Sequence, residues 1–225
     1  MLHRLTLVIV ACCLTSSASA GAWLRDKGSG FLAFSTTARE SAEIEMRMVD
    51  YETSVYAEYG VLPKLTLGFD GNVNGDLAGH ALIFARLPLA DNALGGRFAF
   101  ELGLGASTYL GETARLLKLA LSYGRGFSGP GGGWLAIDAA FENRRLTGQD
   151  FWKLDATLGL PSQRKTRPLL QVETTTDPDG ATYWSVIPSL LFDRGDGQTW
   201  LLGIESKHAP GLDTLGIKLG IWKSF

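Results

Sequence analysis

Residues 51–72, YETSVYAEYGVLPKLTLGFDGN, decide the fold of this 225-residue chain. Apolar or small side chains alternate with polar ones through two runs, which are separated by a turn around Pro63. The alternating sets are Thr53, Val55, Ala57 and Tyr59 against Glu52, Ser54, Tyr56 and Glu58, and then Leu65, Leu67 and Phe69 against Lys64, Thr66, Gly68 and Asp70. Because successive side chains of a strand point to opposite faces of a sheet, each run has one apolar and one polar face. The stretch therefore predicts a β-hairpin.

The same two-residue period continues along the chain. It recurs at about residues 29–38, 80–88, 97–104, 116–123, 134–142, 152–160, 169–176, 182–192, 200–205 and 215–221. Together with the hairpin, these segments predict an all-β fold, a closed antiparallel transmembrane β-barrel of about 12 strands. The apolar faces are expected outside and the polar faces inside. Ten or fourteen strands remain open, because residues 80–88 and residues 182–192, which include Pro188, alternate less clearly.

The N-terminus predicts export. Arg4 precedes an apolar run at residues 5–14, and the small residues Ala18, Ser19 and Ala20 precede Gly21. This order is typical of a cleaved signal peptide at residues 1–20, with the barrel at residues 21–225. A lipoprotein cleavage before Cys12 remains an alternative.

Composition excludes several classes of function. Cys12 and Cys13 are the only cysteines and leave with the predicted signal, so no disulfide, thiol nucleophile or cysteine-ligated metal is expected. A formal net charge of −2 gives no reason to expect a nucleic-acid partner. We expect no cofactor and no metal. The 28 glycines and the 10% of aromatic residues suit a membrane barrel.

The hairpin at residues 59–68, YGVLPKLTLG, and the final strand at residues 212–225, LDTLGIKLGIWKSF, carry a resemblance. With the signal, they make the chain similar to small outer-membrane β-barrel proteins of Gram-negative bacteria. The resemblance implies contact with outer-membrane lipid and lipopolysaccharide. It also implies that Phe225, preceded by Ile221 and Leu219, is the signal read by the barrel-insertion machinery. Lys223 stands where an aromatic residue is usual. The GAW and GSGF motifs near the start resemble a group of exported barrel proteins, a likeness that implies no activity.

The polar faces predict the residues of the lumen. They are Glu52, Glu58, Asp70, Glu101, Lys118, Asp138, Glu142, Lys153, Asp155, Glu173, Glu205 and Lys218, together with Lys64 and Arg97. Acidic residues outnumber basic ones in this set, which predicts a passive pore for small solutes with a modest preference for cations. The alternative is that these charges pair with one another and plug the barrel.

A different class of function is a lipid hydrolase. Ser206 and His208 share one strand face, and Asp213 could orient the histidine. Serine and histidine near loops are common, so an enzyme is the less favoured interpretation.

Two expectations concern the rims of the barrel. Residues 39–50 are predicted to form the longest outer loop. Four tryptophans near strand ends, Trp23, Trp152, Trp200 and Trp222, are predicted to lie at the membrane interfaces.

Overall fold

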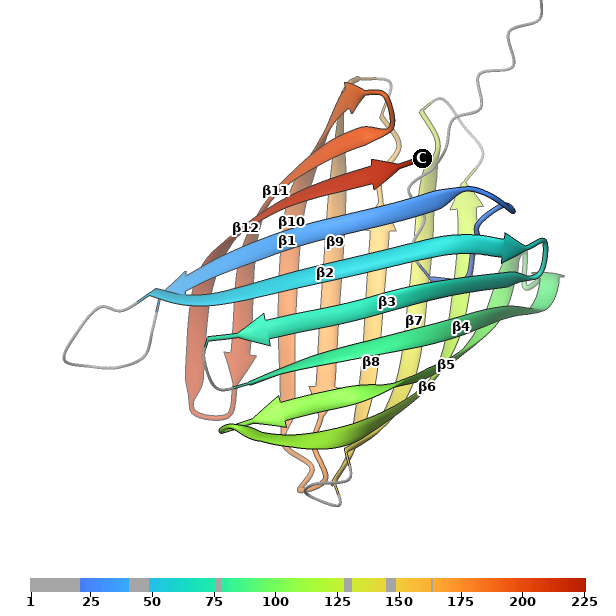
Figure 1. Ribbon diagram of the computed structural model, residues 1–225. Coiled ribbons are helices and arrows are strands. Elements are labelled where there is room, and N and C mark those ends of the chain that lie inside the picture. Colours follow the sequence, from blue (N-terminus) through green and yellow to red (C-terminus); the bar gives the residue numbers. More distant parts are fainter. Residues whose placement is uncertain (1–20, 41–48, 76–77, 128–130, 145–148, 163) are drawn as a thin grey trace, which may run out of the picture.

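The computed structural model is a barrel of antiparallel strands (Figure 1) and describes residues 21–40, 49–75, 78–127, 131–144, 149–162 and 164–225. The predicted signal, including Cys12, lies outside these residues. The strands are β1 (Gly30–Glu40), β2 (Val49–Leu62), β3 (Leu65–Asn74), β4 (Ala78–Ala93), β5 (Gly96–Tyr109), β6 (Glu112–Phe127), β7 (Gly133–Arg144), β8 (Gln149–Gly159), β9 (Thr166–Thr176), β10 (Thr182–Gly195), β11 (Gln198–Ala209) and β12 (Leu212–Ser224).

Each strand pairs with its neighbours in the sequence, and β1 pairs with β12 to close the barrel. The prediction of a closed antiparallel barrel of about 12 strands is therefore confirmed. Closure leaves no strand edge, so the backbone groups of the sheet are hydrogen-bonded within the wall. We call the end at which Gly30 and Phe225 meet the terminal end, and the opposite end the distal end.

Several turns are as short as a hairpin allows. Leu94–Gly95, Leu110–Gly111 and Asp196–Gly197 each have positive φ angles at both residues. That is the backbone of a two-residue turn whose twist matches the strands on either side. Short connections of this kind fix the register between strands.

The outer surface is apolar around its middle. Phe69, Leu104, Ile204 and Leu219 are among the large hydrophobic residues exposed there. Over the described residues, charged outward side chains such as Arg115 lie only near strand ends.

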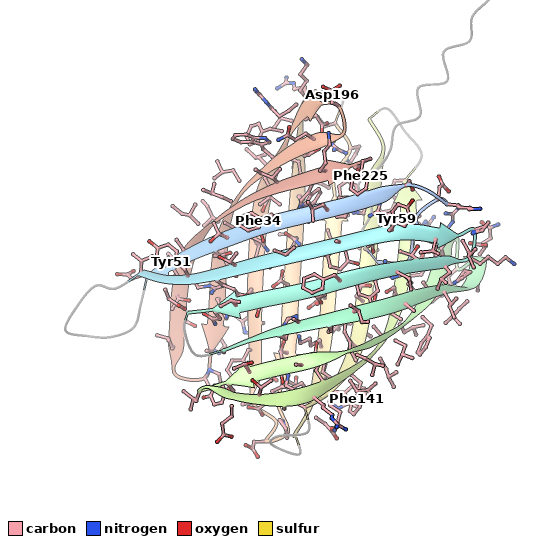
Figure 2. All side chains as sticks on the ribbon, viewed as in Figure 1. Phe34, Tyr51, Tyr59, Phe141, Asp196 and Phe225 are labelled. Atoms are coloured by element: carbon pink, nitrogen blue, oxygen red, sulfur yellow. The ribbon has the colours of Figure 1, made fainter. Side chains whose placement is uncertain are left out.

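Aromatic side chains mark both ends of the apolar zone. Figure 2 shows Tyr51 and Tyr59 at opposite ends of β2, with Phe34 between them on the neighbouring strand. Tyr51 is 57% exposed and Tyr59 47% exposed. Rings at both edges of an apolar band are typical of a barrel that crosses a membrane. No helix in the described part of the chain is long and apolar enough to cross a membrane.

Three boundary predictions were wrong. Arg39, predicted in an outer loop, is buried in β1, because the alternation of Ser35 and Thr37 extends one step further. Lys64, predicted in the lumen, is exposed in the turn after β2. Arg97 was also predicted to line the lumen. Its side chain is instead 57% exposed at the start of β5 and pairs with Asp91 at the rim of the barrel.

The prediction for the tryptophans was half right. Trp152 and Trp200 are exposed on the outer surface, at 62% and 51%. Trp23 and Trp222 instead pack against an apolar cluster inside the barrel. Nearness to a strand end does not determine the side to which a ring points.

Candidate functional site: the barrel lumen

The centre of the barrel holds a cavity of about 310 Å³. Its lining mixes charged and aromatic side chains from opposite walls, among them Tyr56, Arg86, Lys118, Asp138 and Lys218. A second cavity, of about 290 Å³, is lined by Glu52, Glu173, Tyr183 and Lys207. Lys153 and Asp155 line both cavities. A space bordered by charged side chains thus extends from the distal part of the lumen to its centre.

Apart from Lys64 and Arg97, the ionisable residues that the alternation assigns to the lumen lie on the inner wall. Some are fully enclosed: the side chains of Glu58, Glu101, Glu142 and Glu205 are at most 4% exposed. Others border the cavities, as Asp70 and Lys118 do. The structure also shows how these groups are partnered, which the sequence pattern does not contain.

Arg86 on β4 is the centre of the largest charged network. Its guanidinium donates to Glu58, to Glu101 Oε2 at 2.6 Å and to the Tyr56 hydroxyl at 2.8 Å. Glu58 also accepts a 2.6 Å hydrogen bond from Arg25 Nε. A buried charge costs several kcal/mol unless it is paired and hydrogen-bonded, so these groups are stable only together.

The network continues toward the distal end through Lys118. Its ammonium lies 3.2 Å from Glu101 Oε1 and 3.5 Å from Asp70 Oδ2. Asp70 in turn lies 3.3 Å from His80 Nε2. Acid and base therefore alternate along this side of the lumen.

A second network surrounds Arg39 near the distal end. Its guanidinium donates to Glu205 on β11 and, at 2.5 Å, to Glu52 on β2. Lys207 lies 3.8 Å from Glu52. Since β1 stands between β2 and β12 at the closure of the barrel, these contacts join strands from both ends of the chain.

Sequence reasoning missed four of these cations: Arg25, Arg39, Arg86 and Lys207. Arg39 and Arg86 follow the two-residue period of their strands, so extending the alternation would have found them. Arg25 precedes β1 in a segment without alternation, and no local signal places it. With these arginines inside, the excess of acidic residues is smaller than the sequence suggested.

The opposite wall carries an acidic row. Asp138 on β7 is directly opposite Asp155 on β8, which is opposite Glu173 on β9. Asp138 accepts a hydrogen bond from Ser122 Oγ, and Asp155 accepts one from the backbone N–H of Thr174 at 3.2 Å. Among the described residues, no basic side chain lies within 4.0 Å of either aspartate, whereas Glu173 lies 3.7 Å from Lys218. Like charges placed directly opposite destabilise a sheet, so this row has a cost.

The terminal end of the lumen is apolar, whereas the alternation predicted a polar interior throughout. Trp134, Leu169, Leu191 and Leu201 form a buried cluster with Ala136. The ring of Trp134 covers Gly159, its cross-strand neighbour, where a Cβ atom would overlap the ring. Large rings over glycines fill a small barrel without forcing its strands apart.

The N-terminal segment enters this end of the barrel. In Figure 1 the segment, in dark blue, turns back from the start of β1 into the interior. Trp23 packs against the apolar cluster, and Ala22 is 1% exposed. The backbone N–H of Arg25 donates to Thr66 Oγ1 at 2.8 Å, and that of Gly28 donates to the Gly60 carbonyl at 2.8 Å. Residues 21–29, which we call the N-terminal plug, therefore occupy part of the lumen.

The candidate hydrolase residues are only partly brought together. His208 Nδ1 lies 2.5 Å from Asp213 Oδ1 across the β11–β12 pair, and its ring stacks on Trp184 at 5.3 Å. Ser206 is exposed on the outer face, two residues before His208 on β11, and no hydrogen bond joins the two within the described residues. The histidine is therefore partnered by Asp213 and not by the serine.

The described residues contain no group of three or more His, Cys, Asp or Glu side chains placed to hold a metal ion.

Comparison with known proteins finds similarity of structure alone. No protein-family model and no curated sequence matches the chain. Among solved structures, a KdgM porin superposes with a TM-score of 0.59 and 9% identity, covering 87% of this chain and 99% of the porin. A NanC porin gives 0.57 and 12%, with 84% and 98% coverage. The COG4313 outer membrane channel from Pseudomonas putida F1 gives 0.55 and 13%, with 93% and 99% coverage. The chain thus has the fold of outer-membrane porins.

Proposed function

We propose that this protein is a passive pore for small hydrophilic solutes in the bacterial outer membrane. One observation carries the proposal: a cavity of about 310 Å³, lined by charged side chains as well as apolar ones, lies inside a barrel whose outer surface is apolar around its middle. A barrel with an apolar outer surface is stable in a membrane, because lipid then covers that surface. Its interior would connect the aqueous compartments on the two sides of the membrane.

The structural neighbours support the same reading. Two are described as porins and one as an outer membrane channel, and each is covered over almost its whole length. The KdgM porin is also known in complex with a disordered oligogalacturonate. The shared fold is compatible with a solute pathway through this barrel, although identities of 9–13% do not carry the choice of solute across.

The acidic row is the feature that would set ionic preference. Most other lumenal charges are neutralised by a partner within about 3.5 Å, but Asp155 borders both cavities without such a partner among the described residues. An uncompensated carboxylate beside a narrow passage attracts cations. We therefore propose a modest preference for cations and assign it to Asp155 and Glu173 rather than to an overall count of acids.

Several companion features belong to this proposal. Residues 1–20 would be removed on export, and Phe225, Ile221 and Leu219 would present the insertion signal. The aromatic rings and the basic side chains near strand ends would meet lipid and lipopolysaccharide.

Planar-bilayer recording tests the pore. Purified protein should produce discrete conductance steps, and a KCl gradient should give a reversal potential of the sign of a cation-preferring pore. Asp155→Asn and Glu173→Gln should each move that potential toward zero.

Asp91→Asn is the matched control, because Asp91 lies at the rim with a 70% exposed side chain and should leave the potential unchanged. Absence of any conductance from correctly folded protein would refute the pore and favour the barrel plugged by paired charges.

A further inference from the structure

Gly21 lies inside the barrel next to the carboxylate of Asp138. Gly21 is buried, and a Cβ built on it would lie 3.1 Å from both carboxylate oxygens of Asp138. The α-nitrogen is bonded to the same Cα atom, so it lies two bonds, about 2.5 Å, from the position that contacts the carboxylate. Asp138 is the residue of the acidic row nearest to the plug, and Ser122 is its hydrogen-bonding partner.

The predicted cleavage site falls at this same residue. Hydrolysis of the Ala20–Gly21 peptide bond consumes one water and leaves a carboxylate on Ala20 and a protonated α-amine on Gly21. Processing would therefore create a positive charge beside a half-buried carboxylate that has no basic partner among the other described residues. A charge-assisted hydrogen bond between them would offset the cost of burying each charge.

We propose that signal removal completes the N-terminal plug: the new α-ammonium of Gly21 pairs with Asp138 and holds residues 21–29 in the terminal end of the lumen. Before cleavage the nitrogen belongs to a neutral amide and cannot form this pair. The plug then narrows the passage on the side where the apolar cluster lies. This regulatory part rests on the proposed pore function, whereas the ion pair itself does not.

Three further contacts hold the N-terminal plug against the inner wall of the barrel. A Cβ on Gly124 would lie 2.5 Å from the ring of Trp23, so this glycine in β6 makes room for the indole. Arg25 Nε donates to Glu58 at 2.6 Å, and a parallel bridge joins Lys27 to Gly60. The segment is therefore held at its middle and at its end by the barrel wall, which leaves Gly21 directed to Asp138.

The first test measures whether the mature chain begins at Gly21 and how accessible its α-amine is. Intact-mass measurement of the exported protein should give a chain that begins at Gly21. A reagent selective for α-amines, such as 2-pyridinecarboxaldehyde, should then label the folded barrel slowly and the urea-unfolded chain fast. Asp138→Asn should speed labelling of the folded barrel by at least about tenfold, the effect of losing one charge-assisted hydrogen bond.

Two matched variants guard against a general loss of structure. Asp155→Asn removes the neighbouring acid of the row and should leave the labelling rate unchanged. Gly124→Ala should release Trp23 and speed labelling, whereas Gly126→Ala, on the same strand with no atom within 4 Å of its added Cβ, should not. Each variant should retain the electrophoretic mobility of a folded barrel.

The outcomes separate this inference from the pore. Equal labelling of wild type and Asp138→Asn, or a mature chain that begins elsewhere, would overturn the ion pair even if the barrel conducts. Protected labelling in a barrel without conductance would support the ion pair and refute the pore. In a conducting barrel, Asp138→Asn and Gly124→Ala should raise single-channel conductance above that of wild type, whereas Gly126→Ala should leave it unchanged. An unchanged conductance would overturn the regulatory role.

Discussion

Gly30 and Phe225 exchange two backbone hydrogen bonds at the point where the chain closes on itself. The N–H of Gly30 donates to the Phe225 carbonyl at 2.7 Å, and the N–H of Phe225 donates to the Gly30 carbonyl at 3.0 Å. The Phe225 ring also occupies the place that a side chain at position 30 would need. The first and last strands, β1 and β12, are therefore joined where the ring of Phe225 covers Gly30. Phe225 is labelled in Figure 2.

Adding a side chain at this junction should weaken the barrel. Gly30→Val would push the Phe225 ring away, and overpacking of this kind costs about 1–3 kcal/mol. We expect the folded band in unboiled SDS electrophoresis to be lost at a lower temperature than for wild type. Gly126→Ala is the control, because its added methyl meets nothing. Identical melting of the two variants would show that the junction tolerates a displaced ring.

The network around Arg86 should be the most sensitive part of the interior. Arg86→Met leaves Glu58 and Glu101 without their shared partner, and breaking a buried ion pair typically costs about 3–5 kcal/mol. Urea titration of the folded barrel in detergent should show the loss.

The matched control is Arg97→Met, whose pair with Asp91 is exposed and should be worth about 0–1 kcal/mol. A smaller loss at Arg86 than at Arg97 would contradict the burial of the network.

A charge on the middle of the outer surface should impair insertion. Ile204 is 61% exposed on β11, opposite Ile217 on β12. Ile204→Lys should destabilise the inserted barrel by about 2–4 kcal/mol if that surface meets the bilayer core. The yield of folded protein in lipid vesicles measures it.

Leu94→Lys, in a turn at the terminal end and 80% exposed, should fold as wild type does. Equal yields for the two lysine variants would argue against a membrane around β11.

The outer-face serine is expected to be dispensable. Ser206 lacks a hydrogen bond to His208 within the described residues, so Ser206→Ala should leave both conductance and the phospholipids of reconstituted vesicles unchanged. Chromatography of the vesicle lipids after incubation provides the measurement. Release of fatty acid by wild type that Ser206→Ala abolishes would restore the hydrolase interpretation.

Local sequence was sufficient for the wall of the barrel. The alternation in residues 51–72 assigns each side chain to one face without knowledge of any other strand, because successive side chains of a strand point to opposite sides. The same rule placed Glu58, Asp138 and Glu205 inside and Leu67 and Ile204 outside. Extended by one step, it would also have placed Arg39 in the lumen rather than in a loop.

Closure of the barrel determines what the interior contains and how its charges are partnered. Arg39 and Glu205 are 166 residues apart in the chain, and they meet because closure of the barrel brings β1 close to β11 across β12. Trp23 and Gly21 lie in a segment without alternation, so no periodic signal directs them into the lumen. The face of a side chain is a local property of the strand, whereas its partner depends on the diameter and register of the closed barrel, which no single stretch of sequence contains.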